Sequence, residues 1–417
     1  VTIVNAVGLN LAASTMGGTF SGTATNGHIT QSGALTITGA ATFITATTSK
    51  NIILDQNNAF ASSVTMQAGD GSAAFNHITF KDSGGVDLVS SASSSAGKLF
   101  IDATNNLAVG GNLSITATTG NMTQSGALDI EGVTTLVTLD QGAGIVLTTD
   151  TNAFTSELLI TTHDNDTPTD TTYAADVSID GGTTNLIIGT STIDGNLTLR
   201  SGGTIIDTNS STVTVKGTLS ATTDASNSVI TLNDLAVTGA FTLAPHGTGA
   251  VTIVNQAGLN LAASTMGGTF SGTATTGNIT QSGALAITGT STLVTSADNG
   301  KIDLKDNSIT NAFTGKLLIT TNDTGSETDG DVEIDGGTTN LIIGLSTIEG
   351  DLDLVSGGTI TDDGIATVRG TLTATTDASD RAITLNQLAV VGAFTLAPNG
   401  TGAVTIVNAA GLNLAAS

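Results

Sequence analysis

The amino-acid sequence predicts an all-β fold, a repetitive right-handed parallel β-helix (β-solenoid) of roughly 20 rungs, from about 20 residues per rung. Three observations lead to this prediction. Long segments recur almost unchanged along the 417 residues, short alternating strands open on glycine at a regular spacing, and glycine-containing dipeptides separate the strands. A coil of stacked strands accounts for all three, because each circuit of the coil repeats the one before.

The recurring segments define the organisation of the chain. Residues 1–39 recur at 251–289 with five differences, and residues 152–245 recur at 311–398. The segment 404–417 repeats 1–14 with one change. We therefore expect one continuous solenoid over 1–417, either as a window from a longer tandem array or as a unit whose end passes in register into the next copy.

The strands alternate apolar with polar residues, as in Gly283–Thr288, Gly315–Thr320 and Gly370–Ala374. This period places one face inward and the other in solvent. Gly-Gly, Asp-Gly and Asn-Gly pairs between the strands suit tight corners. A sandwich of hairpins would use the same turns, but near-identical strands returning at the spacing of one circuit, rich in Val, Ile and Thr, favour stacked parallel rungs.

Phenylalanines recur in two phrases and predict two core positions. Phe60, Phe154 and Phe313 each end an Asn-Ala-Phe triplet, and Phe241 and Phe394 lie in Gly-Ala-Phe-Thr-Leu. Because each phrase returns in its duplicate, we interpret each set as one position of the core on successive circuits.

Composition excludes several classes of protein. The chain has 52 Gly but only 3 Pro, without a three-residue period, which excludes collagen. Its 39% hydrophobic content argues against disorder. The formal net charge of −25, with ten scattered basic residues, argues against nucleic-acid binding. No cysteine is present to form a disulfide, and no apolar run of about 18 residues predicts a membrane span. The start on Val1, without a signal peptide, indicates an excised or mature portion.

The strand phrases resemble a known family. The Gly-x-Leu-x-Ile-Thr strands, Asn311–Leu317 (Asn-Ala-Phe-Thr-Gly-Lys-Leu) and Gly277–Gly283 (Gly-Asn-Ile-Thr-Gln-Ser-Gly) are similar to the β-strand repeats of filamentous-haemagglutinin-like adhesins and related giant bacterial surface proteins. The similarity covers essentially the whole chain. It implies a right-handed β-helical shaft, with secretion and tip binding in other segments.

No catalytic motif is evident, and we expect no enzyme activity and no resident cofactor. Sugar-cleaving β-helices need paired carboxylates with aromatic or cationic subsites, and this chain has one Tyr and no Trp. Three of its four histidines are replaced by asparagine in the internal duplicates: His28 by Asn278, His163 by Asn322 and His246 by Asn399. An exchange of this kind is typical of a corner residue rather than a general base.

Two acidic loops offer a calcium-binding hypothesis. The oxygens of aspartates that lie close together in sequence could coordinate Ca²⁺. The candidates are Asp164, Asp166, Asp170, Asp329 and Asp331. Neither loop matches an EF-hand, and the two differ in length, so an exposed insertion is the alternative interpretation.

We expect an extracellular or cell-surface structural protein: an adhesin shaft or a surface filament that associates end to end by axial β-stacking. Surface glycans, or host or neighbouring cell surfaces, are further possible partners, and nucleic acid is not expected. The alternative is a calcium-assisted carbohydrate-binding or carbohydrate-cleaving β-helix. An ice-binding or mineral-nucleating face ranks last, because the strands mix Thr with Asp, Asn and Ser.

Overall fold

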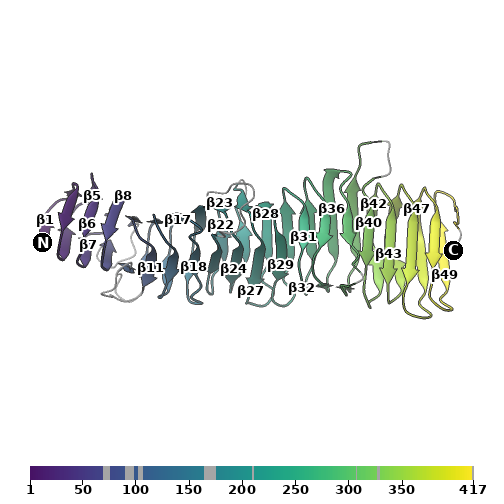
Figure 1. Ribbon diagram of the computed structural model, residues 1–417. Coiled ribbons are helices and arrows are strands. Elements are labelled where there is room, and N and C mark those ends of the chain that lie inside the picture. Colours follow the sequence, from purple (N-terminus) through teal and green to yellow (C-terminus); the bar gives the residue numbers. More distant parts are fainter. Residues whose placement is uncertain are drawn as a thin grey trace. The chain divides into compact units, whose positions relative to one another are not determined.

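The computed structural model describes residues 1–68, 76–89, 98–101, 107–163, 175–208, 211–306, 308–325 and 329–415. All regular structure in these ranges is β-strand, and the strand pairings between β1 and β49 are parallel. The fold is a parallel β-solenoid, which confirms the predicted class (Figure 1). Two compact units divide the chain, Val1–Gly217 and Thr218–Ser417, so a single continuous solenoid over 1–417 stays a prediction.

In the first unit, one turn consists of three short strands, each on its own face. Strands on one face pair with the strand one turn later, as Thr2–Asn5 pairs with Ser21–Ala24. The first face begins with β1 (Thr2–Asn5), β4 (Phe20–Ala24), β7 (Ala41–Thr45) and β9 (Val64–Ala68). The second contains β2 (Leu9–Leu11), β5 (Ile29–Gln31), β8 (Ile52–Phe60), β10 (Ile78–Asp82), β14 (Leu113–Ala117), β17 (Thr134–Gln141) and β20 (Glu157–His163). The third contains β3 (Ser14–Met16), β6 (Leu35–Ile37) and the end of β8, then β13 (Leu107–Val109), β16 (Leu128–Ile130) and β19 (Ala153–Phe154).

The second unit repeats this arrangement. Its first column contains β28 (Ile230–Val237), β30 (Val251–Asn255), β33 (Phe270–Ala274), β36 (Ser291–Asp298) and β39 (Leu317–Asn322). A second contains β29 (Ala240–Ala244), β31 (Leu259–Leu261), β34 (Ile279–Gln281), β37 (Ile302–Leu304), β40 (Val332–Asp335), β43 (Leu352–Ser356), β46 (Leu372–Thr376) and β48 (Phe394–Ala397). A third contains β32 (Ser264–Met266), β35 (Leu285–Ile287) and β38 (Ala312–Phe313), and the unit ends with β47 (Ile383–Val390) and β49 (Val404–Asn408).

Alternation along each strand builds the core. In β4, for example, Phe20, Gly22 and Ala24 are buried while Ser21 and Thr23 are partly exposed. Because register is kept from turn to turn, the inward residues form continuous apolar columns. Each fully buried Val, Leu or Ile contributes roughly 1.5–3 kcal/mol relative to an exposed one, before conformational entropy is counted.

Both predicted phenylalanine positions lie in the core. Phe154, Phe313, Phe241 and Phe394 are at most 1% exposed, and Phe60 is 7% exposed. Phe154 and Phe313 pair in register with Ile130 and Ile287, and Phe60 pairs with Ile37. In the first unit, Phe60 also stacks on Phe80, with ring centroids 5.6 Å apart.

The two most repeated phrases of the sequence meet at one inner corner. The asparagine of each Asn-Ala-Phe triplet donates an amide hydrogen bond to the glutamine of the Gln-Ser-Gly-Ala-Leu phrase one turn earlier, and in the first two pairs the glutamine also donates to the asparagine. The pairs are Gln31 with Asn58, Gln124 with Asn152 and Gln281 with Asn311. Each buried asparagine also accepts the N–H of the leucine in the glutamine's phrase, for example Leu285 at 2.9 Å from Asn311 Oδ1. These bonds satisfy polar groups that burial would otherwise leave unpaired.

At an outer corner, side-chain acceptors of one turn accept backbone N–H groups of the next turn, and we call this set of bonds the corner column; in the second unit it includes Asn278 with Lys301 and Asp331 with Asp351. Asn51 donates its backbone N–H to His28 Nδ1 at 2.9 Å, and His77 donates to Asn51 Oδ1 at 3.0 Å. Asn112 donates in turn to His77 Nδ1 at 2.8 Å. In each bond the acceptor side chain belongs to the earlier turn and the donor to the later one.

The solenoid has about 16 turns rather than roughly 20. Turn length varies along the chain. One turn separates Leu9 from Ile29, but one turn also separates Ile78 from Leu113. A uniform rung length, as the sequence estimate assumed, therefore overcounts the turns.

Candidate functional site

One segment occurs three times in the chain in three different environments. The segment beginning Val-Thr-Ile-Val-Asn forms β1 in the first turn of the first unit, β30 inside the second unit and β49 in the last turn. Strand β30 is paired on both sides, with β28 and with β33. Strand β1 pairs with β4 alone and β49 with β47 alone, among the described strands.

Exposure of the apolar side chains follows this difference. Val251 in β30 is 1% exposed, whereas its counterparts Val1 and Val404 are 66% and 40% exposed. Leu412 and Leu414 are also exposed at the last turn, although their counterparts Leu259 and Leu261 are buried. Each terminal turn therefore presents an unpaired strand edge together with inward-type apolar side chains.

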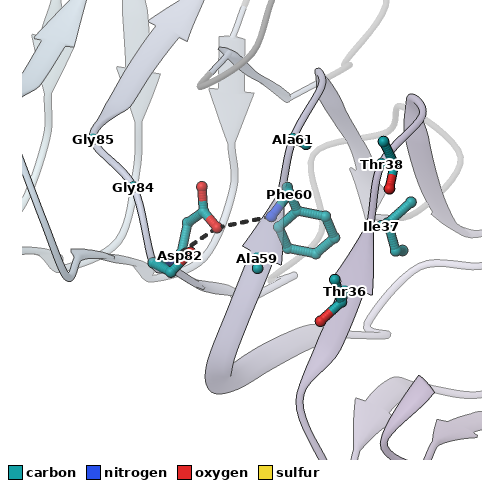
Figure 2. A pocket seen from close by; sticks show the side chains of 10 residues that line it. Thr36, Ile37, Thr38, Ala59, Phe60, Ala61, Asp82, Gly84 and Gly85 are labelled. Carbon is teal, nitrogen blue, oxygen red and sulfur yellow. Dashed lines mark hydrogen bonds between the residues drawn. The ribbon is translucent and has the colours of Figure 1, made fainter. Parts of the chain in front are cut away.

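On the third face of the first unit, a surface cavity of about 450 Å³ lies beside the end of β8. We call it the Phe60 groove. Figure 2 shows its residues, with the Asp82 carboxylate reaching toward the backbone of Phe60. Its walls are mainly apolar. They consist of Thr36, Ile37, Thr38, Ala59, Phe60, Ala61, Asp82, Ser83, Gly84 and Gly85.

Asp82 is the ionisable group of this groove, and it is only 4% exposed. Its Oδ1 accepts the backbone N–H groups of Phe60 at 3.1 Å and Ser83 at 2.9 Å. Burial raises the pKa of Asp82 above its ordinary value, against the opposing effect of the backbone hydrogen bonds. The groove thus combines apolar walls with one buried carboxyl group.

The corresponding corners elsewhere in the chain carry additional residues. One turn after β19 and β38, the chain runs Asp180-Gly-Gly and Asp335-Gly-Gly, followed in both cases by Thr-Thr-Asn. Gly337 bridges to Ala312, and the Thr339 hydroxyl donates to the Phe313 carbonyl at 3.2 Å. Phe154 and Phe313 are each 1% exposed under these corners. At the first corner, Val86 follows Gly84-Gly85 directly, and no Thr-Thr-Asn segment is present.

An acidic strip crosses three neighbouring strands of the second unit. Asp303 on β37, Glu333 on β40 and Asp353 on β43 are neighbours in register. Two lysines balance part of the charge: Lys301 Nζ lies 2.6 Å from Asp331 Oδ2, and Lys305 pairs with Asp353. The hydrogen bond with Asp331 raises the pKa of Lys301.

The calcium candidates fall into two sets. Asp164, Asp166 and Asp170 lie outside the described residues. Asp331 is occupied on both oxygens, because Oδ2 meets Lys301 and Oδ1 accepts the Asp351 N–H at 3.1 Å. Within the described ranges, no three His, Cys, Asp or Glu side chains are placed together so that they could hold a metal ion, and this includes any group around Asp329. The same ranges contain no helix long and apolar enough to span a membrane.

Of the histidines that exchange with asparagine, His28 and His246 lie between strands, and His163 is the last residue of a strand. His28 Nδ1 and Asn278 Oδ1 have the same role, since each accepts a backbone N–H from the following turn. His246 and Asn399 each donate a backbone N–H to a threonine hydroxyl, on Thr223 and Thr376. His163 ends β20 where Asn322 ends β39.

Asp82 and the Phe60 groove did not emerge from the sequence analysis. A signal was present: two of the three corners carry Thr-Thr-Asn after the glycines, and the first lacks it. Aligning the corners rather than the longest duplications would have singled out residues 82–86.

A family model matches five successive segments, residues 1–67, 78–161, 174–244, 248–320 and 329–397. Together they cover most of the sequence. The chain belongs to the family of repeats of unknown function (DUF5649). Family membership fixes the repeat character of the whole sequence and assigns no activity to it. No curated protein and no solved structure matches the chain.

Proposed function

We propose that the chain is an extracellular structural protein: a repeat segment of a surface filament or adhesin shaft of the filamentous-haemagglutinin-like kind, which associates end to end by axial β-stacking. The observation that carries this proposal is the triple occurrence of the Val-Thr-Ile-Val-Asn turn. Inside the second unit this turn pairs on both sides through β30, whereas β1 and β49 each pair on one side among the described strands.

The association buries side chains that are already of core type. Placing β1 of one copy on β49 of another aligns Val1 with Val404 and Ile3 with Ile406. It extends the parallel ladder by one step and removes both unpaired edges. The existing bonds β1–β4 and β47–β49 stay intact, so stacking adds contacts without breaking any.

The test compares two lysine substitutions in the same strand. Val404→Lys places a charge on the inward side of β49, where stacking would bury it unpaired at a cost of several kcal/mol. Val407→Lys is the matched control, because Val407 is 55% exposed and its interior counterpart Val254 is still partly exposed. Electron microscopy and sedimentation velocity measure the lengths of the particles.

The expected result is end-to-end multimers for the wild-type chain and for Val407→Lys, with monomers for Val404→Lys. Wild-type chain that stays monomeric at every accessible concentration, or multimers that persist unchanged in Val404→Lys, would contradict axial stacking. The extracellular setting is tested separately, by locating the protein with antibodies on intact cells.

A further inference from the structure

The chain builds the corner at the Phe60 groove three times, and among the described residues only this first copy lacks the Thr-Thr-Asn segment. At the other two corners, the segments 181–185 and 336–340 lie one turn after the phenylalanine of the Asn-Ala-Phe triplet. Thr339 contacts the Phe313 carbonyl there, and Gly337 bridges to Ala312. At the first corner the chain passes from Gly85 directly into β11 (Val86–Val89), and a cavity of about 450 Å³ remains. This volume lies in the range of small-molecule sites.

The chemistry of the walls restricts the ligand. Ala59 and Ala61 offer apolar surface beside Phe60, which is 7% exposed, while Ile37 lies fully buried beneath them. Asp82 supplies a single carboxylate, and the described ion pairs assign it no lysine or arginine. A buried carboxylate without a counter-ion is best complemented by a cationic hydrogen-bond donor.

We propose that the Phe60 groove binds a small ligand with an apolar body and a primary ammonium group. The ammonium meets the Asp82 carboxylate, and the apolar body lies against Phe60, Ala59 and Ala61. This binding is independent of end-to-end stacking, because the groove is lined by β6, the end of β8 and the corner after β10, and by none of the terminal strands.

The structure offers a position at which the groove can be filled. A Cβ added at Gly84 would meet only Asp82 Oδ2, at 3.5 Å, which is an ordinary contact. Gly84→Leu therefore occupies the cavity without a backbone clash. Gly17→Leu is the matched control, since no atom lies within 4 Å of a Cβ there and Gly17 does not line the groove. Asp82→Asn removes the charge and keeps an oxygen that can accept the Phe60 N–H.

The experiment titrates the full chain with phenylbutylammonium and with neutral phenylbutanol, and follows the amide resonances of Phe60, Ser83 and Gly84 by NMR. We expect the amine to bind about tenfold more tightly than the alcohol. With the amine, both partners of the hydrogen bond are charged, whereas with the alcohol only the Asp82 carboxylate is. Asp82→Asn should bring the amine to the affinity of the alcohol. Gly84→Leu should abolish binding of both probes, and Gly17→Leu should leave both unchanged.

Three results would overturn the proposal: no shift of these resonances in the wild-type chain at low-millimolar probe, equal affinity for amine and alcohol, or undiminished amine binding in Gly84→Leu. Far-UV circular dichroism checks the fold of each variant. If Gly84→Leu fails to fold, the comparison of amine with alcohol in the wild-type chain and in Asp82→Asn still decides the matter.

Discussion

Imidazole and carboxamide share one task in the corner column. His28 accepts the Asn51 N–H through Nδ1, and Asn278 accepts the Lys301 N–H through Oδ1, both at 2.9 Å. The two side chains differ in size and acid–base chemistry but place an acceptor at the same point above the corner. The exchange of histidine for asparagine within one sequence thus has a geometric cause.

Substitutions at His28 test this role. His28→Asn should leave stability unchanged, because it installs the residue that the chain itself uses at position 278. His28→Ala should destabilise the corner by about 0.5–1.5 kcal/mol, since the Asn51 N–H loses its protein partner. Hydrogen exchange at the Asn51 amide measures the effect. Equal protection in the alanine and asparagine variants would refute the acceptor role.

A second residue-level prediction concerns acid. Burial raises the pKa of Asp82 in the folded chain above the ordinary value of 3.8, so the protonated carboxyl is favoured by folding. The stabilisation from protonated Asp82 is complete at pH values below 3.8, and it is lost as the pH rises through the raised pKa of the folded chain. Relative to Asp82→Asn, which does not titrate, the wild-type chain should therefore gain stability on acidification.

The measurement is the difference between the denaturation midpoints of wild type and Asp82→Asn, followed by circular dichroism over a series of pH values. Taking the difference removes the titration of the other carboxyl groups. A difference that stays constant over these pH values, or a wild type that loses stability relative to Asp82→Asn in acid, would contradict the raised pKa of Asp82.

At the scale of elements, glycines stack on glycines where one turn enters its strand. In the second unit, the Gly289 N–H donates to the Gly268 carbonyl at 3.1 Å, and a Cβ at Gly289 would lie 2.3 Å from that oxygen. The corner is therefore closed to any side chain. Close approach of backbone to backbone, rather than a positive φ angle, is what requires glycine at this position.

Gly289→Ala should therefore destabilise the second unit by about 1–3 kcal/mol, the usual range for overpacking. Gly17→Ala is the control, because nothing lies within 4 Å of a Cβ at that position. Hydrogen exchange measured by mass spectrometry should show the loss of protection around β30, β33 and β36. Equal loss in the two variants would argue against the clash.

The strands themselves were predictable because their information is local. Alternation and glycine spacing indicated the stacked strands, and the duplicated phrases identified the core positions of Phe154 and Phe241. The partnership of Gln281 with Asn311 was not predictable in this way, because the two amides meet only when one turn is laid on the next. The Phe60 groove depends on residues that are missing from one corner, which a search for similarity passes over.

At the scale of the whole molecule, repetition and charge act in opposite directions. Turn upon turn adds the same kinds of contact, so stability is close to a sum of nearest-neighbour terms. The formal net charge of −25 makes any two copies repel each other. Association of copies therefore depends on the apolar ends overcoming this repulsion.

Salt should favour that association. At about 0.1 M ionic strength the screening length is about 10 Å, which weakens repulsion between exposed charges while leaving apolar contacts intact. The average particle length of the wild-type chain should rise between low and moderate salt, as measured by sedimentation velocity. The monomeric variant Val404→Lys serves as the control, and particles that shorten as salt is added would indicate that ion pairs hold them together.

The corner column gives each unit a chemical polarity. Every acceptor in it belongs to an earlier turn and every donor to a later one, as in His28 with Asn51 and Asp331 with Asp351. The two ends of such a column are consequently unlike: one is left with side-chain acceptors and the other with backbone donors. Copies joined head to tail continue the sequence of donors and acceptors, whereas copies joined head to head would bring like against like. A fibre grown from this chain would have a direction, with two ends that can differ in their rates of growth.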